Sequence, residues 1–130
     1  MTENYIDAFL NTVLPGLRIA VIGDMMVDRY VFGRVERISP EAPVPVNKVE
    51  RVASVLGGAA NVAANLANLD CHVMAAGLVG DDDNAGLLRK LLHTSAIDDS
   101  GLIVRHDHAT TTKMRVLGSR QQMVRLDFEE

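Results

Sequence analysis

The chain has 130 residues, the usual size of a single globular domain. Hydrophobic residues make up 48% of it and charged residues 23%, so it can bury a core and is not intrinsically disordered over most of its length. Its formal net charge of −4 argues against the basic surface of a general nucleic-acid or membrane-surface binder, and we expect neither partner. No apolar run reaches the roughly 20 residues that cross a bilayer, the N-terminal residues lack the cationic start of a signal peptide, and the single cysteine, Cys71, fits a reducing cytoplasm.

The first half of the chain contains a helix pattern, a strand pattern and a segment rich in proline. Residues 5–14 carry apolar residues at helical spacing and stop at Pro15, which predicts a helix. Residues 17–24 form a short apolar run that ends in Gly-Asp, which is typical of a buried strand in a parallel sheet. Residues 28–56 include three prolines, which cannot donate to a neighbouring strand. We therefore predict edge strands or an extended excursion there, not central strands.

The middle of the chain alternates between helix and strand patterns. Residues 59–69 place apolar residues and asparagines on two separate stripes at positions i, i+4 and i+7, which predicts an amphipathic helix. Residues 71–80 resemble the first strand. Asp82 or Asp83 can cap the leucine-rich helix that follows, and residues 97–104 predict one more strand. Strand, helix and strand in series indicate an α/β fold with a parallel sheet.

The last segment predicts a β-hairpin. Within residues 112–128 apolar and charged side chains alternate on both sides of a turn after Gly118, so one face is apolar and the other charged. Lys113 and Arg115 lie on the charged face.

A glycine pair before the predicted helix is the first candidate for ligand binding. The phosphate-binding pattern G-x-x-x-x-G-K-[ST] and the dinucleotide pattern G-x-G-x-x-G are both absent. Gly57 and Gly58 allow the backbone to approach a ligand, and the amides at a helix start attract electronegative oxygens. Asn61, in the first turn, can exchange hydrogen bonds with hydroxyls. The alternative is a glycine-rich loop beside a merely polar helix face.

Carboxylates provide the second group of candidates. Asp24 and Asp28 follow the first predicted strand, at the end where open α/β sheets bind ligands. Either can accept hydrogen bonds from two sugar hydroxyls or cap a helix, and Asp28, farther from the strand end, is the better ligand candidate. The acidic cluster at 81–83 is explained by a helix start, and the His-Asp-His run at 106–108 by a solvated loop, so we predict no metal site.

The glycine pair belongs to a longer motif. Residues 57–63, Gly-Gly-Ala-Ala-Asn-Val-Ala, together with the later Gly80, resemble the N-terminal signature of the ribokinase-like (PfkB) carbohydrate kinases. Asp70 stands where this signature prefers Gly or Ser. That departure affects the turn after the helix and not the ligand loop.

Three further segments narrow the resemblance to one group of kinases within this family. Residues 37–46, 112–117 and 121–130 are similar to the kinase domain of bacterial D-glycero-D-manno-heptose-7-phosphate kinases. Those kinases phosphorylate the C1 hydroxyl in ADP-heptose synthesis for lipopolysaccharide, often fused to an adenylyltransferase. The resemblance implies ATP and Mg²⁺ as cofactors of the complete enzyme.

The resemblance also implies a fold and assigns substrate binding and catalysis to different halves of the kinase domain. The expected fold is α/β and ribokinase-like: the N-terminal half of a doubly wound, mostly parallel sheet, with a small β lid from about 30–55 and 112–128. In the family the catalytic base, the anion hole and the ATP site belong to the second half. We therefore expect residues 1–130 to form the sugar-binding half, with no catalytic residue and no kinase activity of its own.

The expected substrate site combines both sets of candidates. Hydroxyls are expected at Asp28, Gly57, Gly58 and Asn61, and the 7-phosphate at Lys113 and Arg115. The alternative for the two cations is a solvated lid face. A homodimer through the lid is expected, because the lid strands would otherwise expose apolar surface. Two other functions stay open: a non-catalytic sugar-phosphate-binding remnant, and a fragment of another PfkB-family sugar kinase.

Overall fold

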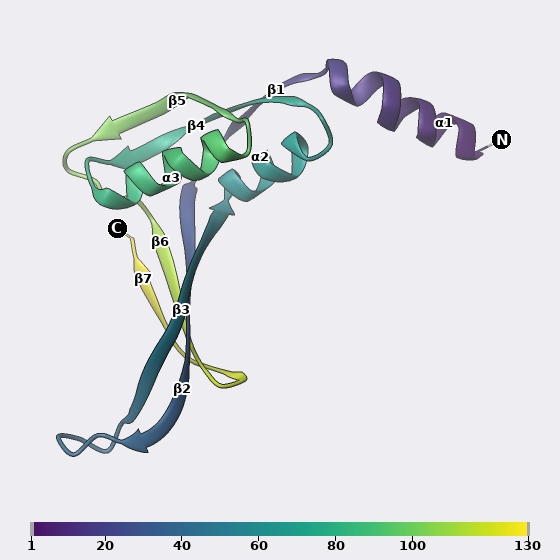
Figure 1. Cartoon of the computed structure of the whole chain (residues 1–130). Coiled ribbons are helices and arrows are strands. Elements are labelled where there is room, and N and C mark those ends of the chain that lie inside the picture. The colour runs from purple at the N-terminus through teal and green to yellow at the C-terminus, as the bar shows by residue number, and fades with distance from the viewer. Residues whose placement is uncertain (1, 130) are drawn as a thin grey trace.

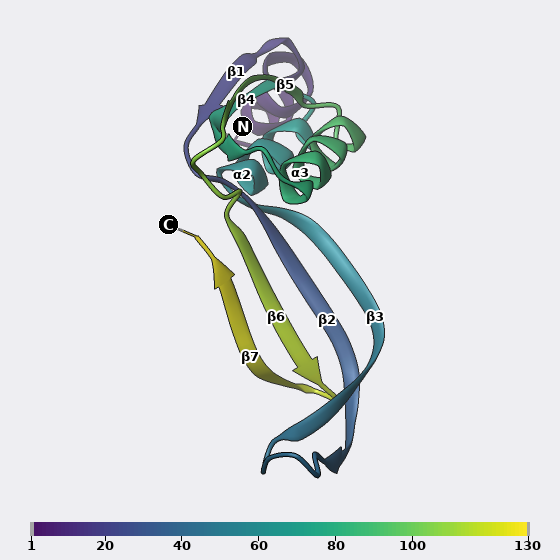
Figure 2. The same cartoon turned by 90° about the vertical axis from the view of Figure 1, so that its left-hand side faces the viewer.

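The computed structural model describes residues 2–129 and consists of two layers of different character. One is a three-stranded sheet with two helices on one side, and the other is a long four-stranded sheet that extends away from it (Figures 1 and 2). We call the four-stranded sheet the lid. The first helix projects from the body at the far end (Figure 1).

The helices and strands follow one another with short connections. In chain order they are α1 (Thr2–Ala8), a π-helical turn (Phe9–Val13), a 3-10 turn (Leu14–Gly16), β1 (Arg18–Ile22), β2 (Met25–Ile38), β3 (Pro45–Gly58), α2 (Ala59–Ala67), β4 (His72–Gly80), α3 (Asp83–Thr94), β5 (Asp98–Arg105), β6 (Thr112–Gly118) and β7 (Gln121–Phe128). The helices and strands predicted in the middle of the chain are thus confirmed, as is the hairpin.

The three-stranded sheet has the order β1-β4-β5, and both of its strand pairs are parallel. Its core lies on the side of α2 and α3, where Val73, Val79, Leu88 and Leu92 are buried. The opposite side is uncovered, and Ile22 in β1 is 79% exposed. The prediction of a buried first strand is therefore wrong for one of its faces.

The lid has the order β3-β2-β6-β7, with β2 antiparallel to β3 and parallel to β6. Both β2 and β3 lie outside the parallel sheet and β3 is an edge strand, as predicted, whereas β2 is an interior strand of the lid, which the prediction of edge strands did not foresee. The prolines do not interrupt β2, because they lie in the connection at 39–44 and at Pro45, the first residue of the edge strand β3.

Helix α2 buries a different face from the one its sequence indicates. Ala60 and Ala63 are fully buried, whereas Val62 and Leu69, which belong to the apolar stripe of the sequence, are about half exposed. Alanine side chains allow the helix to lie close to the strands, so backbone proximity rather than side-chain size selects the buried face.

Helical backbone is confirmed for the first predicted helix, extending to Gly16 through the π-helical and 3-10 turns. Its apolar side chains, including Ile6, Phe9 and Leu10, stay largely exposed, and Leu14 is the residue of this segment that joins the core.

Asp82 links the start of α3 to the segment that enters the lid. Its Oδ1 accepts a hydrogen bond from the backbone N–H of Ala85 at 2.8 Å, which confirms it as the helix cap. Its Oδ2 accepts from the N–H of Thr110 at 2.8 Å, and the Thr110 hydroxyl accepts from the N–H of Gly80 at 2.9 Å. Burial opposes ionisation, but the hydrogen bonds from Thr110 and Ala85 outweigh it and lower the pKa of Asp82.

Asp82→Ala is expected to lower the free energy of unfolding by about 1–2 kcal/mol at pH 7, because two backbone donors lose their acceptor. A carboxylate with a lowered folded-state pKa stabilises above its unfolded pKa of about 3.9 and loses this effect as the pH falls through the folded value. The difference between the parent and the variant, measured by urea unfolding from pH 7 to pH 2, should therefore shrink only below about pH 4. Asp83→Ala is the control, and equal effects of both variants would contradict the cap.

Candidate functional site

The candidate site lies where the lid meets the carboxyl ends of the parallel strands. A cleft of about 460 Å³ opens there, lined by Gly23 and Asp24 after β1, Gly77 in β4 and Lys113 in β6. Carboxyl ends of parallel strands are where open α/β sheets bind ligands, because helix starts and loops converge there. The backbone is tightly packed at this point, since a side chain on Gly77 would collide with the carbonyl oxygen of Gly23.

Asp28 lies in β2 and forms an ion pair with Arg115 of β6. Arg115 Nη1 donates to Asp28 Oδ1 at 2.8 Å, and the two side chains are only 23% and 19% exposed, respectively. The hydrogen bond with Asp28 raises the pKa of Arg115 against the opposing effect of burial, so this guanidinium stays charged at all physiological pH values. Asp28 lies within a strand and caps no helix, which removes the structural alternative considered for it.

The two glycines form the turn from β3 into α2 and lie against the acidic residues. A Cβ on Gly57 would be 2.7 Å from Asp28 Oδ2. Gly58 has a φ of +54°, and a Cβ there would be 2.6 Å from the carbonyl oxygen of Asp24. That same oxygen accepts a hydrogen bond from the N–H of Ala59 at 3.0 Å. Glycine is therefore required at both positions by close approach, and at Gly58 also by its backbone conformation.

The two remaining predicted site residues are Lys113 and Asn61. Lys113 lines the cleft on the same face of the lid as Asp28 and Arg115, and its Nζ is 3.9 Å from Glu129 Oε2. Asn61 is exposed in the first turn of α2, three residues after Gly58. The structure thus brings Asp28 against both Gly57 and Arg115, whereas Lys113 is the predicted site residue that lines the cleft and Asn61 lies exposed on α2.

Sequence reasoning missed an aromatic and cationic arrangement on the same face. The rings of Tyr30 and Phe32 stack with centroids 6.1 Å apart, the Arg115 guanidinium lies 5.3 Å from the Tyr30 centroid, and that of Arg51 lies 3.9 Å from the Phe32 centroid. We call this side of the lid, with Asp28, Tyr30, Phe32, Lys113 and Arg115, the charged face. The alternation of positions 28, 30 and 32 would have revealed it, had β2 been recognised as an interior strand.

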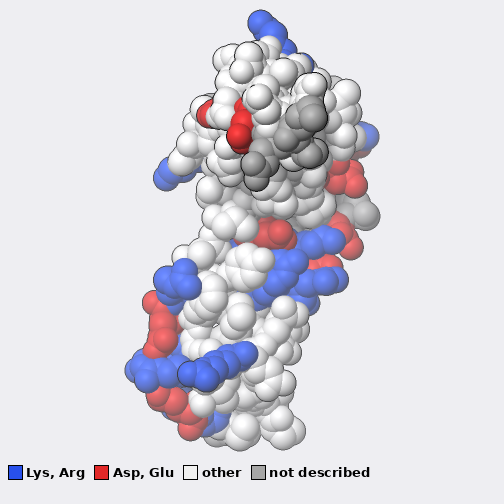
Figure 3. Space-filling view, turned by 90° about the vertical axis from the view of Figure 1, so that its right-hand side faces the viewer, with Lys and Arg blue, Asp and Glu red and all other residues white. Residues whose placement is uncertain are grey.

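Basic side chains gather on the lid on the side of the molecule that Figure 3 shows. Figure 3 shows, from one side, Lys and Arg gathered on the lid with Asp and Glu among them, whereas the other layer is mostly uncharged. Arg125 of β7 lies opposite Arg115 in the sheet, and Asp127 accepts hydrogen bonds from Arg125 at 2.9 and 3.0 Å. This ion pair offsets the repulsion between the two neighbouring arginines.

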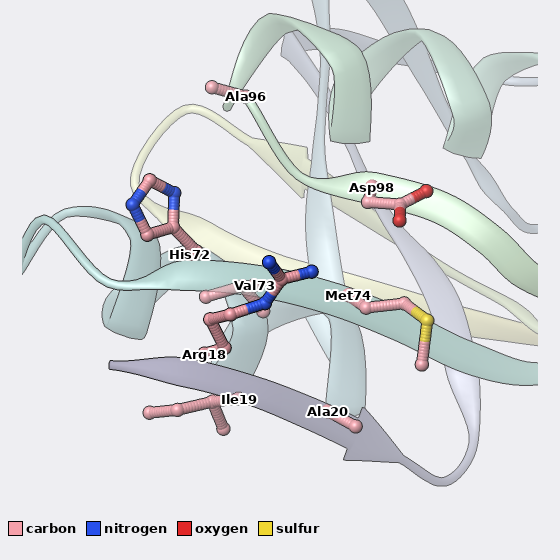
Figure 4. Close-up of a pocket in the computed structure, with 8 residues that line it drawn as sticks. All are labelled: Arg18, Ile19, Ala20, His72, Val73, Met74, Ala96 and Asp98. Atoms are coloured by element: carbon pink, nitrogen blue, oxygen red, sulfur yellow. The ribbon is translucent and has the colours of Figure 1, made fainter. Parts of the chain in front are cut away.

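A second hollow lies at the opposite, amino end of the strands. It encloses about 340 Å³ on the uncovered side of the sheet, with Arg18, His72 and Asp98 along it (Figure 4).

Residues 2–129 contain no group of three His, Cys, Asp or Glu side chains placed to share a metal ion. In the loop considered for metal binding, His106 Nδ1 lies 3.0 Å from Asp81 Oδ2 and Asp107 pairs with Arg105. Every helix in this described part of the chain is too short or too polar to span a bilayer.

Solved structures with the same arrangement define the fold class. A carbohydrate kinase from Agrobacterium tumefaciens superimposes with a TM-score of 0.70 at 21% identity, covering 86% of this chain and 35% of that one. A ribokinase from Arabidopsis thaliana, complexed with ribose and ATP, gives 0.67 at 18% identity, with the same coverage of both chains. At these identities the likeness shows the fold, which is ribokinase-like, as expected from the sequence.

Sequence similarity then gives the family. Residues 17–128 match the profile of the pfkB family carbohydrate kinases, and the chain belongs to this family. It is 51% identical over 113 residues to the bifunctional protein HldE of Shewanella denitrificans, and 45% identical over 128 residues to that of Desulfatibacillum aliphaticivorans. These alignments cover 87% and 98% of this chain but only 24% and 26% of the relatives, so the chain spans about a quarter of their length.

Proposed function

We propose that the chain is the sugar-phosphate-binding part of an ATP-dependent heptose 7-phosphate kinase, which phosphorylates the C1 hydroxyl on the route to ADP-heptose and lipopolysaccharide. The observation that carries this proposal is the Asp28–Arg115 pair, held against the Gly57 turn beside the cleft. Its support from sequence is the identity of about half to the HldE proteins.

The charges suit a sugar phosphate. Asp28 provides an anionic acceptor for hydroxyls, and Asn61 and the backbone at Gly58 add neutral hydrogen-bonding groups nearby. Arg115 and Lys113, on the same face, provide cations for the phosphate. Arginine can hold a phosphate through two parallel N–H groups and lysine acts as a point charge, so the pair fixes both the orientation and the charge of the ligand.

ATP is the phosphoryl donor in this proposal. The Arabidopsis ribokinase was solved with ATP, and a Cryptococcus neoformans ribokinase of the same fold, with a TM-score of 0.62 and 17% identity, was solved in complex with ADP. Mg²⁺ is the expected metal, but residues 2–129 offer no matching cluster of ligands, so we derive no step through it. A cytoplasmic location belongs to the proposal and agrees with the buried, free thiol of Cys71.

The direct test is calorimetric titration of the 130-residue chain with heptose 7-phosphate, heptose and inorganic phosphate. We expect the phosphorylated heptose to bind most tightly. Lys113→Ala should weaken that binding by about tenfold and leave heptose unchanged, because only the phosphate contacts the lost cation. Lys90→Ala, on the exposed side of α3, is the matched control. If the parent binds none of the three ligands, or if Lys113→Ala weakens both sugars equally, the assignment is wrong.

The proposed homodimer concerns the other side of the lid. Val52, Val31, Val116 and Val124 lie in one row across its four strands, and we call this side the apolar face. Val52 and Val124 are about half exposed. We infer that a second copy covers this face, because exposed apolar surface of this extent favours association. Phe32 does not belong to this face, because it lies on the charged face beneath Arg51.

Val124→Lys is expected to make the chain monomeric, because it places a charge at one end of the covered row, on the edge strand β7. Sedimentation velocity over a concentration series should show a dimer for the parent and a monomer for this variant. Gln122→Lys adds the same charge on the same strand, but opposite Leu117, outside the apolar row, and should leave the dimer intact. A parent chain that stays monomeric at the highest concentrations would contradict the dimer.

A further inference from the structure

The Asp28 carboxylate is already engaged in the ligand-free chain. Its Oδ1 accepts from Arg115 at 2.8 Å, and its Oδ2 faces the backbone of Gly57, where not even a methyl group would fit. Among the described residues, Arg115 is its hydrogen-bond donor. Two adjacent hydroxyls that bind both oxygens would therefore have to share Oδ1 with Arg115 or displace it.

Arg115, in contrast, can donate further hydrogen bonds. A guanidinium carries five N–H donors, and the structure gives one of them to Asp28. The group rests near the Tyr30 ring and lies on the same face of the lid as Lys113, and Lys113 in turn lines the cleft. The like charge opposite it, Arg125, is offset by Asp127. An anion that attracts Arg115 thus has to replace its hydrogen bond to Asp28, and the weaker attraction of Asp127, which pairs with Arg125, acts in addition.

We propose that Arg115 is a displaceable lock on Asp28. When a sugar phosphate binds, its phosphate draws the guanidinium away from the carboxylate, and Asp28 then accepts hydrogen bonds from the hydroxyls of that sugar. This inference rests on the proposed function and makes Arg115 the residue that selects phosphorylated sugars. An unphosphorylated sugar that displaces Arg115 from Asp28 breaks the ion pair without replacement. A sugar phosphate exchanges one anion for another and releases the acceptor for its hydroxyls. Such a mechanism requires the ligand to bind more tightly when Arg115 has left Asp28 than when the two are paired. The attraction between the phosphate and Arg115 supplies this difference in affinity.

The lock predicts a change in the affinity for heptose that would not occur if Arg115 only bound the phosphate. If Arg115 only held the phosphate, its removal would weaken heptose 7-phosphate and leave heptose unchanged. If it also closes Asp28, its removal should strengthen heptose binding. The gain should be about two- to fivefold, which is the range for a partly exposed ion pair.

The experiment is calorimetric titration of Arg115→Ala with heptose and with heptose 7-phosphate, both at fixed salt. Arg115→Met is the second variant, because it keeps an aliphatic stem beside Tyr30 if alanine impairs folding, and the same directions are expected. Arg125→Ala, which removes the arginine opposite Arg115 but not the Asp28 pair, is the control and should leave heptose binding unchanged.

The outcomes separate the two proposals. Tighter heptose and weaker heptose 7-phosphate binding in both variants supports the lock. Unchanged or weaker heptose binding overturns it, even if the proposed function stands because the parent still prefers the phosphorylated sugar. A parent that binds neither sugar overturns the proposed function, and the lock with it.

Discussion

Asp28→Ala is expected to lower the affinity of the chain for heptose 7-phosphate by about 10- to 100-fold. The variant removes an anionic hydroxyl acceptor, and a hydrogen bond to a charged group contributes about 1.5–3 kcal/mol. The affinity is measured by the same titration as above, with the melting temperature as the test of folding. Asn61→Ala should act in the same direction by less, about two- to tenfold, because its partner hydrogen bonds are neutral.

The control for this prediction is Asp107→Ala, which removes an equal charge from an exposed loop where the carboxylate pairs with Arg105. It should bind the sugar phosphate as the parent does. If Asp28→Ala melts normally and also binds as tightly as the parent, Asp28 is a structural partner of Arg115, and the hydroxyls are held elsewhere.

Gly58→Ala is expected to cost about 2–4 kcal/mol of unfolding free energy, the largest stability effect that we predict for one added methyl group. The backbone has φ +54° and ψ −132°, a region that side-chain-bearing residues avoid at a cost of about 1–3 kcal/mol. The new Cβ would also lie 2.6 Å from the backbone carbonyl oxygen of Asp24, which cannot rotate away because it accepts from Ala59.

The matched control is Gly86→Ala in α3, where no atom lies near the added Cβ. There alanine should stabilise by about 0.5–1 kcal/mol, since it favours helix over the unfolded chain. Both variants are compared with the parent by urea unfolding at one pH. A Gly58→Ala variant as stable as the parent would show that the β3–α2 turn has another conformation.

The sequence by itself determined the elements whose causes are local. Apolar spacing, Gly and Asp at strand ends and a capping carboxylate lie within a few residues of one another, so α2, β4, α3 and β5 could be predicted. The sequence limited the cap of α3 to Asp82 or Asp83, and the structure shows that it is Asp82. The hairpin of β6 and β7 and its two faces follow from alternation alone. The motif at residues 57–63 resembles the signature of the family, and within it Gly58 has the positive φ that favours glycine.

The tertiary structure decided which of these elements are neighbours. Strand β2 is interior because β6, far along the chain, pairs with it in parallel, and nothing in the residues around β2 encodes that pairing. Helix α2 buries Ala60 and Ala63 because of how closely the strands approach it, which its own pattern does not reveal. The central contact of the site, Asp28 with Arg115, joins residues 87 positions apart. A contact of this kind depends on strand order and register, which arise from packing across the whole chain and not from local propensity.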